Sequence, residues 1–166
     1  MYLTPHVLIA SAASKAISKH IKSKTVLYIL AFLTAFILHF ILDAIPHTDW
    51  GSWHGYVDNF PLWLIDYITL GLDLILSLVA FVWLTCIKKM DFWLILITFF
   101  GAALPDLIAV DFIPALHIKF REWPVFSQMF ALSKLTHFRL SFDYYIWGIF
   151  TQLIVSIGGL WYLLKD

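Results

Sequence analysis

Long apolar stretches, separated by basic residues, prolines and short polar loops, dominate the pattern of hydrophobic and polar positions along this chain. Four of these stretches are long enough for an α-helix to cross the hydrocarbon core of a bilayer, which takes about 20 residues. They cover 25–45, 61–87, 92–113 and 143–164. The pattern therefore predicts four long transmembrane helices.

A shorter helix is predicted near the start of the chain, over 5–18. Thr4 suits the position before a helix, and Pro5 suits its first turn. This helix would be about 21 Å long, which is too short to cross a bilayer comfortably. It is rich in alanine and serine, and small residues of this kind let helices approach one another closely in membranes.

A long segment of mixed polarity precedes the last predicted span. Within it, 124–135 places Phe126, Met129 and Phe130 on one helical face, a pattern typical of a helix at the membrane surface. The chain shows no internal repeat. The sequence thus predicts an all-α integral membrane protein, with a single transmembrane helical domain over residues 1–166. It would contain four long transmembrane helices, a short N-terminal helix and an interfacial helix.

Composition supports this prediction and limits the partners. The chain is 61% hydrophobic and 13% charged, whereas soluble domains are about half apolar and about a quarter charged. A chain of this size has too little interior to bury the excess, so lipid is the expected solvent. The formal net charge is zero, and nothing indicates a nucleic-acid partner. With Cys86 as the only cysteine, no disulfide forms within the chain.

Basic residues predict the orientation in the membrane. They cluster within 15–24, at Lys88 and Lys89, and at Lys165, and the predicted spans place all of these on one side. The excess of lysine and arginine marks that side as cytoplasmic. On the opposite side, the loop 47–60 contains neither residue, whereas the segment 114–142 contains Lys119, Arg121, Lys134 and Arg139.

Several acidic residues and histidines lie inside the apolar stretches, where an aspartate at the bilayer centre costs about 2.5–3.5 kcal/mol. His39 and Asp43 are four residues apart and share one helix face. From the rise of a helix, His6, Asp73 and Asp106 are expected at a similar depth, about 10 Å below the outer end of the spans. Five polar side chains from four elements therefore reach one layer.

Imidazole and carboxylate groups in one layer are ligands for Zn²⁺, Mn²⁺ or Fe²⁺. A divalent cation would neutralise the carboxylates and could activate water for hydrolysis. Taken singly, each of these residues is as readily explained by a hydrogen bond between helices, and His47 by an ordinary place in an exposed loop. The combination of His6, His39, Asp43 and Asp106 is harder to explain in that way, and it predicts a metal site.

Three short motifs carry a resemblance to a known family. They are Thr4-Pro5-His6, the run from Leu38 to Asp43 followed by Pro46, His47 and Gly51, and the run from Gly101 to Asp106. They resemble motifs of the bacterial inner-membrane family of membrane-bound metal-dependent hydrolases, although the Leu-Pro-Asp element here follows the His-x-x-x-Asp helix. The resemblance implies that His6, His39, Asp43 and Asp106 are metal ligands, with zinc the first candidate. It also matches Thr136-His137 to the family's Thr-His pair.

The first functional hypothesis is a metal-dependent hydrolase of the bacterial inner membrane. Its site would face the non-cytoplasmic side, and its substrate would be a phospholipid or a lipid-linked phosphoester. Asp73 would be a further ligand or a general base, and His137 would contact the substrate from the outer segment. Arg139 would bind the substrate, because a guanidinium group matches phosphate.

Two other functions fit the same residues. Acids and histidines at membrane depth also mark ion paths, so a small transporter or ion-conducting protein is one alternative. The lack of an inverted repeat speaks against it. The other alternative is a structural or accessory membrane subunit, in which the polar residues join neighbouring helices and no metal binds.

Overall fold

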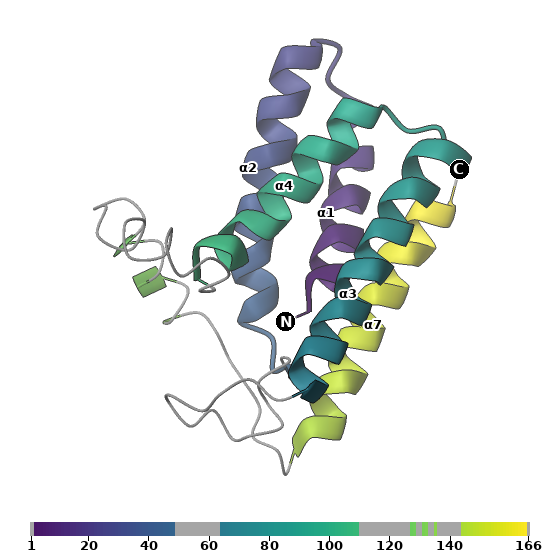
Figure 1. The fold of residues 1–166 in the computed structure, drawn as a ribbon. Coiled ribbons are helices and arrows are strands. Elements are labelled where there is room, and N and C mark those ends of the chain that lie inside the picture. Colours follow the sequence, from purple (N-terminus) through teal and green to yellow (C-terminus); the bar gives the residue numbers. More distant parts are fainter. Residues whose placement is uncertain are drawn as a thin grey trace.

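A computed structural model describes residues 2–48, 64–109 and 144–165, together with a few positions between 127 and 135. The elements in the described part of the chain are all helical. They are α1 (Leu3–Ser18), α2 (Lys24–Asp43), α3 (Leu64–Val82), the π-helical turn η2 (Trp83–Ile87), α4 (Phe92–Ala109) and α7 (Tyr145–Leu164). Figure 1 shows them as a bundle in which α2 and α4 run opposite to α1, α3 and α7.

Three helices are long and apolar enough to cross a membrane, namely Lys24–Asp43, Tyr67–Ile87 and Tyr145–Leu164. Large apolar side chains cover their outer faces, an arrangement that suits lipid and is unfavourable in water. The all-helical prediction is thus confirmed, and three of the four predicted spans correspond to helices with the length and composition to cross a membrane. The fourth span was predicted over 92–113. Its described apolar helix covers Phe92–Leu107, which is shorter than the other three.

The N-terminal helix α1 lies at the centre of the bundle. It contacts α2, α3, α4 and α7. Its buried positions include Ala10, Ser11, Ala12 and Ser14, and these small side chains let four neighbours approach its backbone. The sequence predicted a short helix here, with small residues suited to close packing, but its central position depends on contacts between distant parts of the chain.

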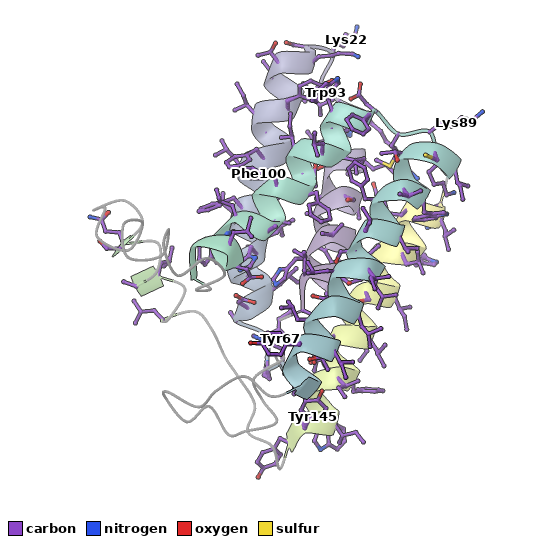
Figure 2. The ribbon with its side chains drawn as sticks, viewed as in Figure 1. Lys22, Tyr67, Lys89, Trp93, Phe100 and Tyr145 are labelled. Carbon is purple, nitrogen blue, oxygen red and sulfur yellow. The ribbon has the colours of Figure 1, made fainter. Side chains whose placement is uncertain are left out.

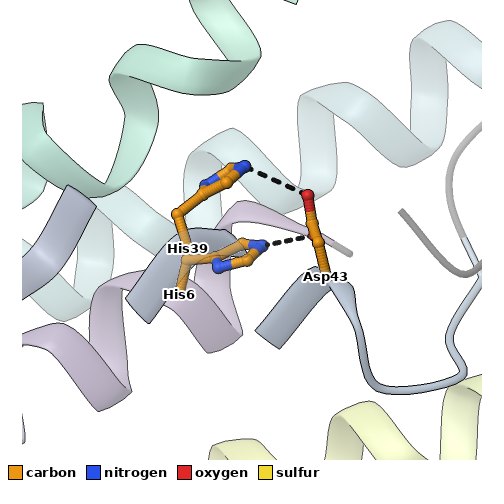
Figure 3. Close-up of side chains that lie close together, drawn as sticks. All are labelled: His6, His39 and Asp43. Atoms are coloured by element: carbon orange, nitrogen blue, oxygen red, sulfur yellow. Dashed lines mark ion pairs between the residues drawn. The ribbon is translucent and has the colours of Figure 1, made fainter. Parts of the chain in front are cut away.

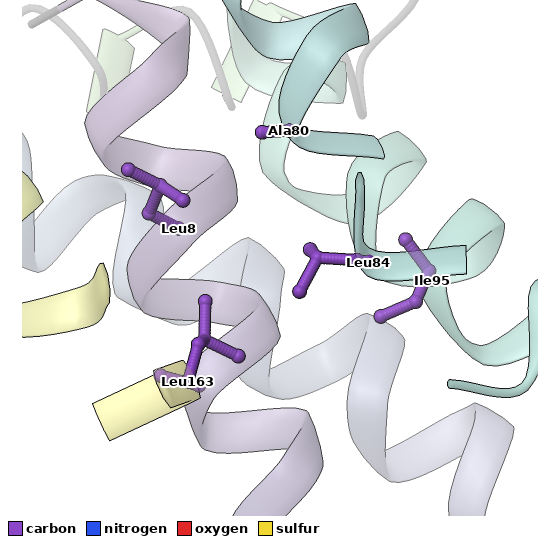
Figure 4. Close-up of a cluster of buried hydrophobic side chains, with 6 residues drawn as sticks. Leu8, Ala80, Leu84, Ile95 and Leu163 are labelled. Carbon is purple, nitrogen blue, oxygen red and sulfur yellow. The ribbon is translucent and has the colours of Figure 1, made fainter. Parts of the chain in front are cut away.

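Apolar side chains from four elements join α1 to the rest of the bundle. The largest cluster consists of Leu8, Ala12, Ala80, Leu84, Ile95 and Leu163 (Figure 4). Since lipid tails are as apolar as leucine, close van der Waals contact is the main source of stability here. Leu84, on η2, is fully buried in this cluster.

Helices α2 and α4 approach closely at a glycine. A Cβ atom on Gly101 would lie 2.8 Å from the backbone oxygen of Phe32 and 3.1 Å from Cβ of Ala35. Any larger residue at this position would push α4 away from α2. The close approach matters for the site, because it places the backbone of Ala102 beside His39.

The lysines of the described residues gather at one end of the bundle, as the sequence predicted for them. Lys22 and Lys89 lie at that end, whereas Tyr67 and Tyr145 lie at the other (Figure 2). Lys15 reaches across from α1 and donates hydrogen bonds to the backbone oxygens of Leu163 and Lys165 at the end of α7. The beginning of α1 and the end of α2 lie towards the other end, the one that carries Tyr67 and Tyr145.

Candidate metal centre

Two antiparallel helices bring three of the candidate ligands together. His6 lies in the first turn of α1, and His39 and Asp43 lie in the last turns of α2. All three side chains are buried, with exposed fractions of 1%, 1% and 0%. They form a His–His–Asp group whose ligand atoms lie within 4.8 Å of one another (Figure 3).

One carboxylate faces both imidazole rings. The Nε2 atom of His6 lies 3.2 Å from Oδ1 of Asp43, and Nε2 of His39 lies 3.1 Å from Oδ2. The two rings stack, with centroids 4.2 Å apart and planes inclined by 15°. Both histidines therefore direct the same ring atom towards the same group.

The backbone fixes which nitrogen of His39 carries a proton. Its Nδ1 lies 2.8 Å from the carbonyl oxygen of Ala102, and a carbonyl oxygen can only accept a hydrogen bond. Nδ1 is therefore the donor, and in the neutral ring Nε2 is left with its lone pair. Metal-binding histidines are usually oriented in this way, by a hydrogen bond from the other ring nitrogen.

His6 is buried without hydrogen bonds. Among the described residues, neither its Nδ1 nor its Nε2 has a hydrogen-bond partner, and the 3.2 Å contact with Asp43 lacks hydrogen-bond geometry. An unsatisfied polar group of this kind costs about 1–3 kcal/mol. A cation close to Nε2 would remove that cost for this nitrogen.

Asp106 lies at the open side of the group. It follows Pro105 within α4, and its Oδ1 is 3.5 Å from Nε2 of His39. Its side chain is 35% exposed, whereas those of His39 and Asp43 are fully buried. The structure thus brings all four predicted metal ligands to one place, and Asp106 on α4 is the one that is partly exposed.

Asp73 has the contacts of a helix cap, whereas the sequence predicted a ligand or a general base. Its carboxylate accepts hydrogen bonds from the backbone N–H groups of Leu3 and Thr4, at 2.6 and 2.9 Å. It also accepts one from the hydroxyl of Thr4, at 2.6 Å. These contacts satisfy donors in the first turn of α1, which an acidic group at this end also stabilises through the helix dipole. Asp73 therefore positions the turn that carries His6.

His47 is fully buried, and its expected place in an exposed loop was wrong. Its Nδ1 lies 2.7 Å from the carbonyl oxygen of Ile45, and its Nε2 lies 3.9 Å from Oδ1 of Asp43. The chain can enter the bundle here because of Gly148 on α7, where a Cβ atom would lie only 2.6 Å from the backbone nitrogen of Thr48. The signal in the sequence was its position, four residues after Asp43.

The other predicted site residues cannot be placed. His137 and Arg139 lie outside the described residues, as does most of the predicted interfacial helix 124–135.

The described residues define the class of this protein: an all-helical chain with three helices suited to crossing a membrane and a buried His–His–Asp group that could hold a metal ion. No family model matches the chain, and comparisons with curated proteins and with solved structures give no match either. An interpretation of function therefore rests on the site itself.

Proposed function

We propose that this protein is a membrane-embedded metal-dependent hydrolase. Its divalent cation is held by His6, His39 and Asp43, with Asp106 as the ligand on the open side. The observation that supports this most strongly is the tautomer of His39, because the lone pair on its Nε2 faces the carboxylates of Asp43 and Asp106. Groups that only accept hydrogen bonds are stable at this distance when a cation or a proton lies among them.

The spacing of the ligand atoms suits a small cation. Metal–ligand bonds of about 2.0–2.1 Å in a tetrahedral site place neighbouring ligand atoms about 3.3 Å apart. Asp43 lies 3.2 Å from His6 and 3.1 Å from His39, and Asp106 lies 3.5 Å from His39. A divalent ion would also balance the charges of two carboxylates, which reduces the cost of burying them in the bundle.

A proton on His39 is the competing explanation, and it corresponds to a structural role. It would pair His39 with Asp43 across the 3.1 Å contact, which also lacks hydrogen-bond geometry, and it would leave both ring nitrogens of His6 without hydrogen bonds among the described residues. A cation bound among the three side chains would bind Nε2 of both rings at once, and only Nδ1 of His6 would remain without a partner among the described residues. The contacts of His6 therefore favour a metal over helix-to-helix hydrogen bonding.

A divalent cation in this position supplies Lewis acidity and activates water for hydrolysis at neutral pH. The protein's own residues decide what reaches it. His6, His39 and Asp43 close the inner side, while Asp106 is partly exposed beside Leu107, which is 52% exposed. A substrate that approaches along α4 meets a carboxylate beside an apolar surface, which suits a phospholipid or a lipid-linked phosphoester.

Zinc is the first candidate for the ion, because two imidazoles and a carboxylate are a common zinc ligand set, and Mn or Fe would also accept these ligands. The described lysines lie at the opposite end of the bundle, so the site would open on the non-cytoplasmic side, in our proposal that of a bacterial inner membrane. Whichever ion is bound, the immediate partner of the protein is the lipid bilayer.

Elemental analysis of the protein purified in detergent tests the proposal. We expect close to one Zn, Mn or Fe per chain in the wild type, and its loss in His39→Gln and Asp43→Asn. His20→Gln is the matched control, because His20 is an exposed histidine after the far end of α1. A folded wild type that takes up no metal, even after reconstitution, would overturn the proposal. Hydrolysis of phosphoesters and lipid esters that a chelator abolishes and the metal restores would then identify the reaction.

A further inference from the structure

We infer that His47 is a further ligand of the same cation, so that the segment after α2 closes the centre. The inference rests on the metal site proposed above and adds a residue to it. His47 reaches the site from a segment that does not belong to any helix. Its role would explain why a histidine from a connecting segment is fully buried.

The ring of His47 is prepared in the same way as that of His39. The carbonyl oxygen of Ile45 accepts a hydrogen bond from Nδ1 of His47 at 2.7 Å, as that of Ala102 does from Nδ1 of His39 at 2.8 Å. A carbonyl oxygen cannot donate, so in both neutral rings the lone pair belongs to Nε2. In both cases Nε2 lies on the side of Asp43.

The distance between His47 and Asp43 is compatible with one shared ion. With His47 the site would be five-coordinate instead of tetrahedral, and ligand atoms on opposite sides of the ion, bound at about 2.0–2.1 Å, would then lie at most about 4.2 Å apart. Nε2 of His47 lies 3.9 Å from Oδ1 of Asp43, which is too long for a hydrogen bond but within that limit. The same oxygen is 3.2 Å from Nε2 of His6, so the two rings approach Asp43 from different elements.

Contacts with α7 hold His47 in this position. The side-chain amide of Gln152 donates hydrogen bonds to the backbone oxygen and the hydroxyl of Thr48, at 2.8 and 3.0 Å. The hydroxyl of Thr151 donates to the backbone oxygen of Pro46. The residues on both sides of His47 are thus fixed to α7, and a ligand at position 47 would couple metal binding to the packing of that helix.

A comparison of His47→Gln with the wild type tests this inference through binding, not activity. Zinc affinity is measured by competition with a chelator, and the ligand environment by the visible absorption of the Co²⁺-loaded protein. We expect the affinity to fall by about tenfold or more, and the Co²⁺ bands to change in position and intensity. His20→Gln should change neither quantity.

A second variant separates a ligand from a structural residue. His47→Glu keeps a group that can bind a cation, so its zinc affinity should exceed that of His47→Gln and its Co²⁺ spectrum should differ from both others. The unfolding temperature of each metal-free variant shows whether the fold is intact. If one metal-free variant has lost its fold, the zinc affinity and the Co²⁺ spectrum of the other variant, compared with those of the wild type, decide whether His47 is a ligand.

The outcomes distinguish this inference from the proposed function. If the wild type binds no metal, the proposed function fails and the inference fails with it. If the wild type binds zinc but His47→Gln has the same affinity and the same Co²⁺ spectrum, only the assignment of His47 is overturned. Equal affinities of His47→Gln and His47→Glu, both below that of the wild type, would also overturn it, because they indicate a structural effect.

Discussion

His39 donates the proton on its Nδ1 to the carbonyl oxygen of Ala102, and this contact between α2 and α4 directs the other ring nitrogen towards Asp43. The contact exists because the two helices are unusually close at Gly101. The chemistry of the site thus depends on a glycine that touches none of the candidate ligands. This dependence can be tested directly.

Gly101→Ala should destabilise the protein and weaken its metal binding. The added Cβ atom would lie 2.8 Å from the backbone oxygen of Phe32, so α4 must move away from α2 and the contact with Ala102 must lengthen. Overpacking of this kind costs about 1–3 kcal/mol. Thermal unfolding in detergent and zinc competition measure the two effects. Gly71→Ala is the control, since a Cβ atom there meets nothing within 4 Å, and unchanged values for both variants would contradict the prediction.

The sequence was sufficient to predict the features that depend on local pattern. Long apolar runs predicted the helices, and the four-residue spacing of His39 and Asp43 predicted one helix face. The rise per residue of a helix predicted a similar depth for Asp106 and His6, and in the structure both lie beside His39 and Asp43. Depth is set by position along one helix, so it can be estimated without knowledge of the neighbours.

The features that the sequence missed depend on contacts between distant parts of the chain. Asp73 has the same depth as the ligands, but its orientation towards the N–H groups of Leu3 and Thr4 is decided by how α3 packs on α1. The burial of His47 requires the space that Gly148 leaves on α7. Neither relation produces a periodic pattern, and the hydrophobic and polar positions alone could not reveal them.

Asp73→Asn should lower stability while leaving the metal in place. The amide retains one acceptor oxygen, but it loses the charge that stabilises the N–H groups at the start of α1. We expect the free energy of unfolding to fall by about 1–3 kcal/mol, and hydrogen exchange to become faster at Leu3 and Thr4. Ser77→Ala, which removes only one partner of the Thr4 hydroxyl, should have a smaller effect. Loss of metal with unchanged exchange would instead support the ligand role predicted from the sequence.

Asp91, at the lysine end, should make a pH-dependent contribution to stability. The backbone N–H of Leu94 donates to its carboxylate, and Lys24 and Tyr28 also bind it, so the pKa of Asp91 is held below its ordinary value. The folded state therefore binds this proton more weakly than the unfolded state. The contribution is complete above the unfolded pKa of about 3.9, and it is lost as the pH falls through the lower folded pKa.

Asp91→Asn tests this contribution when its unfolding temperature is compared with that of the wild type at several pH values. The variant should be less stable at neutral pH, by about 0.2–1 kcal/mol, since the pair with Lys24 is largely exposed and screened by solvent. The difference should shrink as Asp91 of the wild type becomes protonated. A difference that is the same at neutral and strongly acidic pH would contradict the assignment, because it would not depend on the charge.

Metal loading should raise the unfolding temperature, because the proposed ligands join α1 to α2 and α4. An ion that binds only the folded state stabilises it by about 2.7 kcal/mol when its free concentration is a hundred times the dissociation constant. The wild type and His20→Gln should therefore gain stability with added zinc, and His39→Gln and Asp43→Asn should not. Asp106→Asn should keep part of the gain, because Asp106 is 35% exposed and contacts only His39 among the other ligands in the described structure. Equal gains in all five proteins would show that zinc stabilises the bundle at another place, and the His–His–Asp group would then be a structural contact between helices.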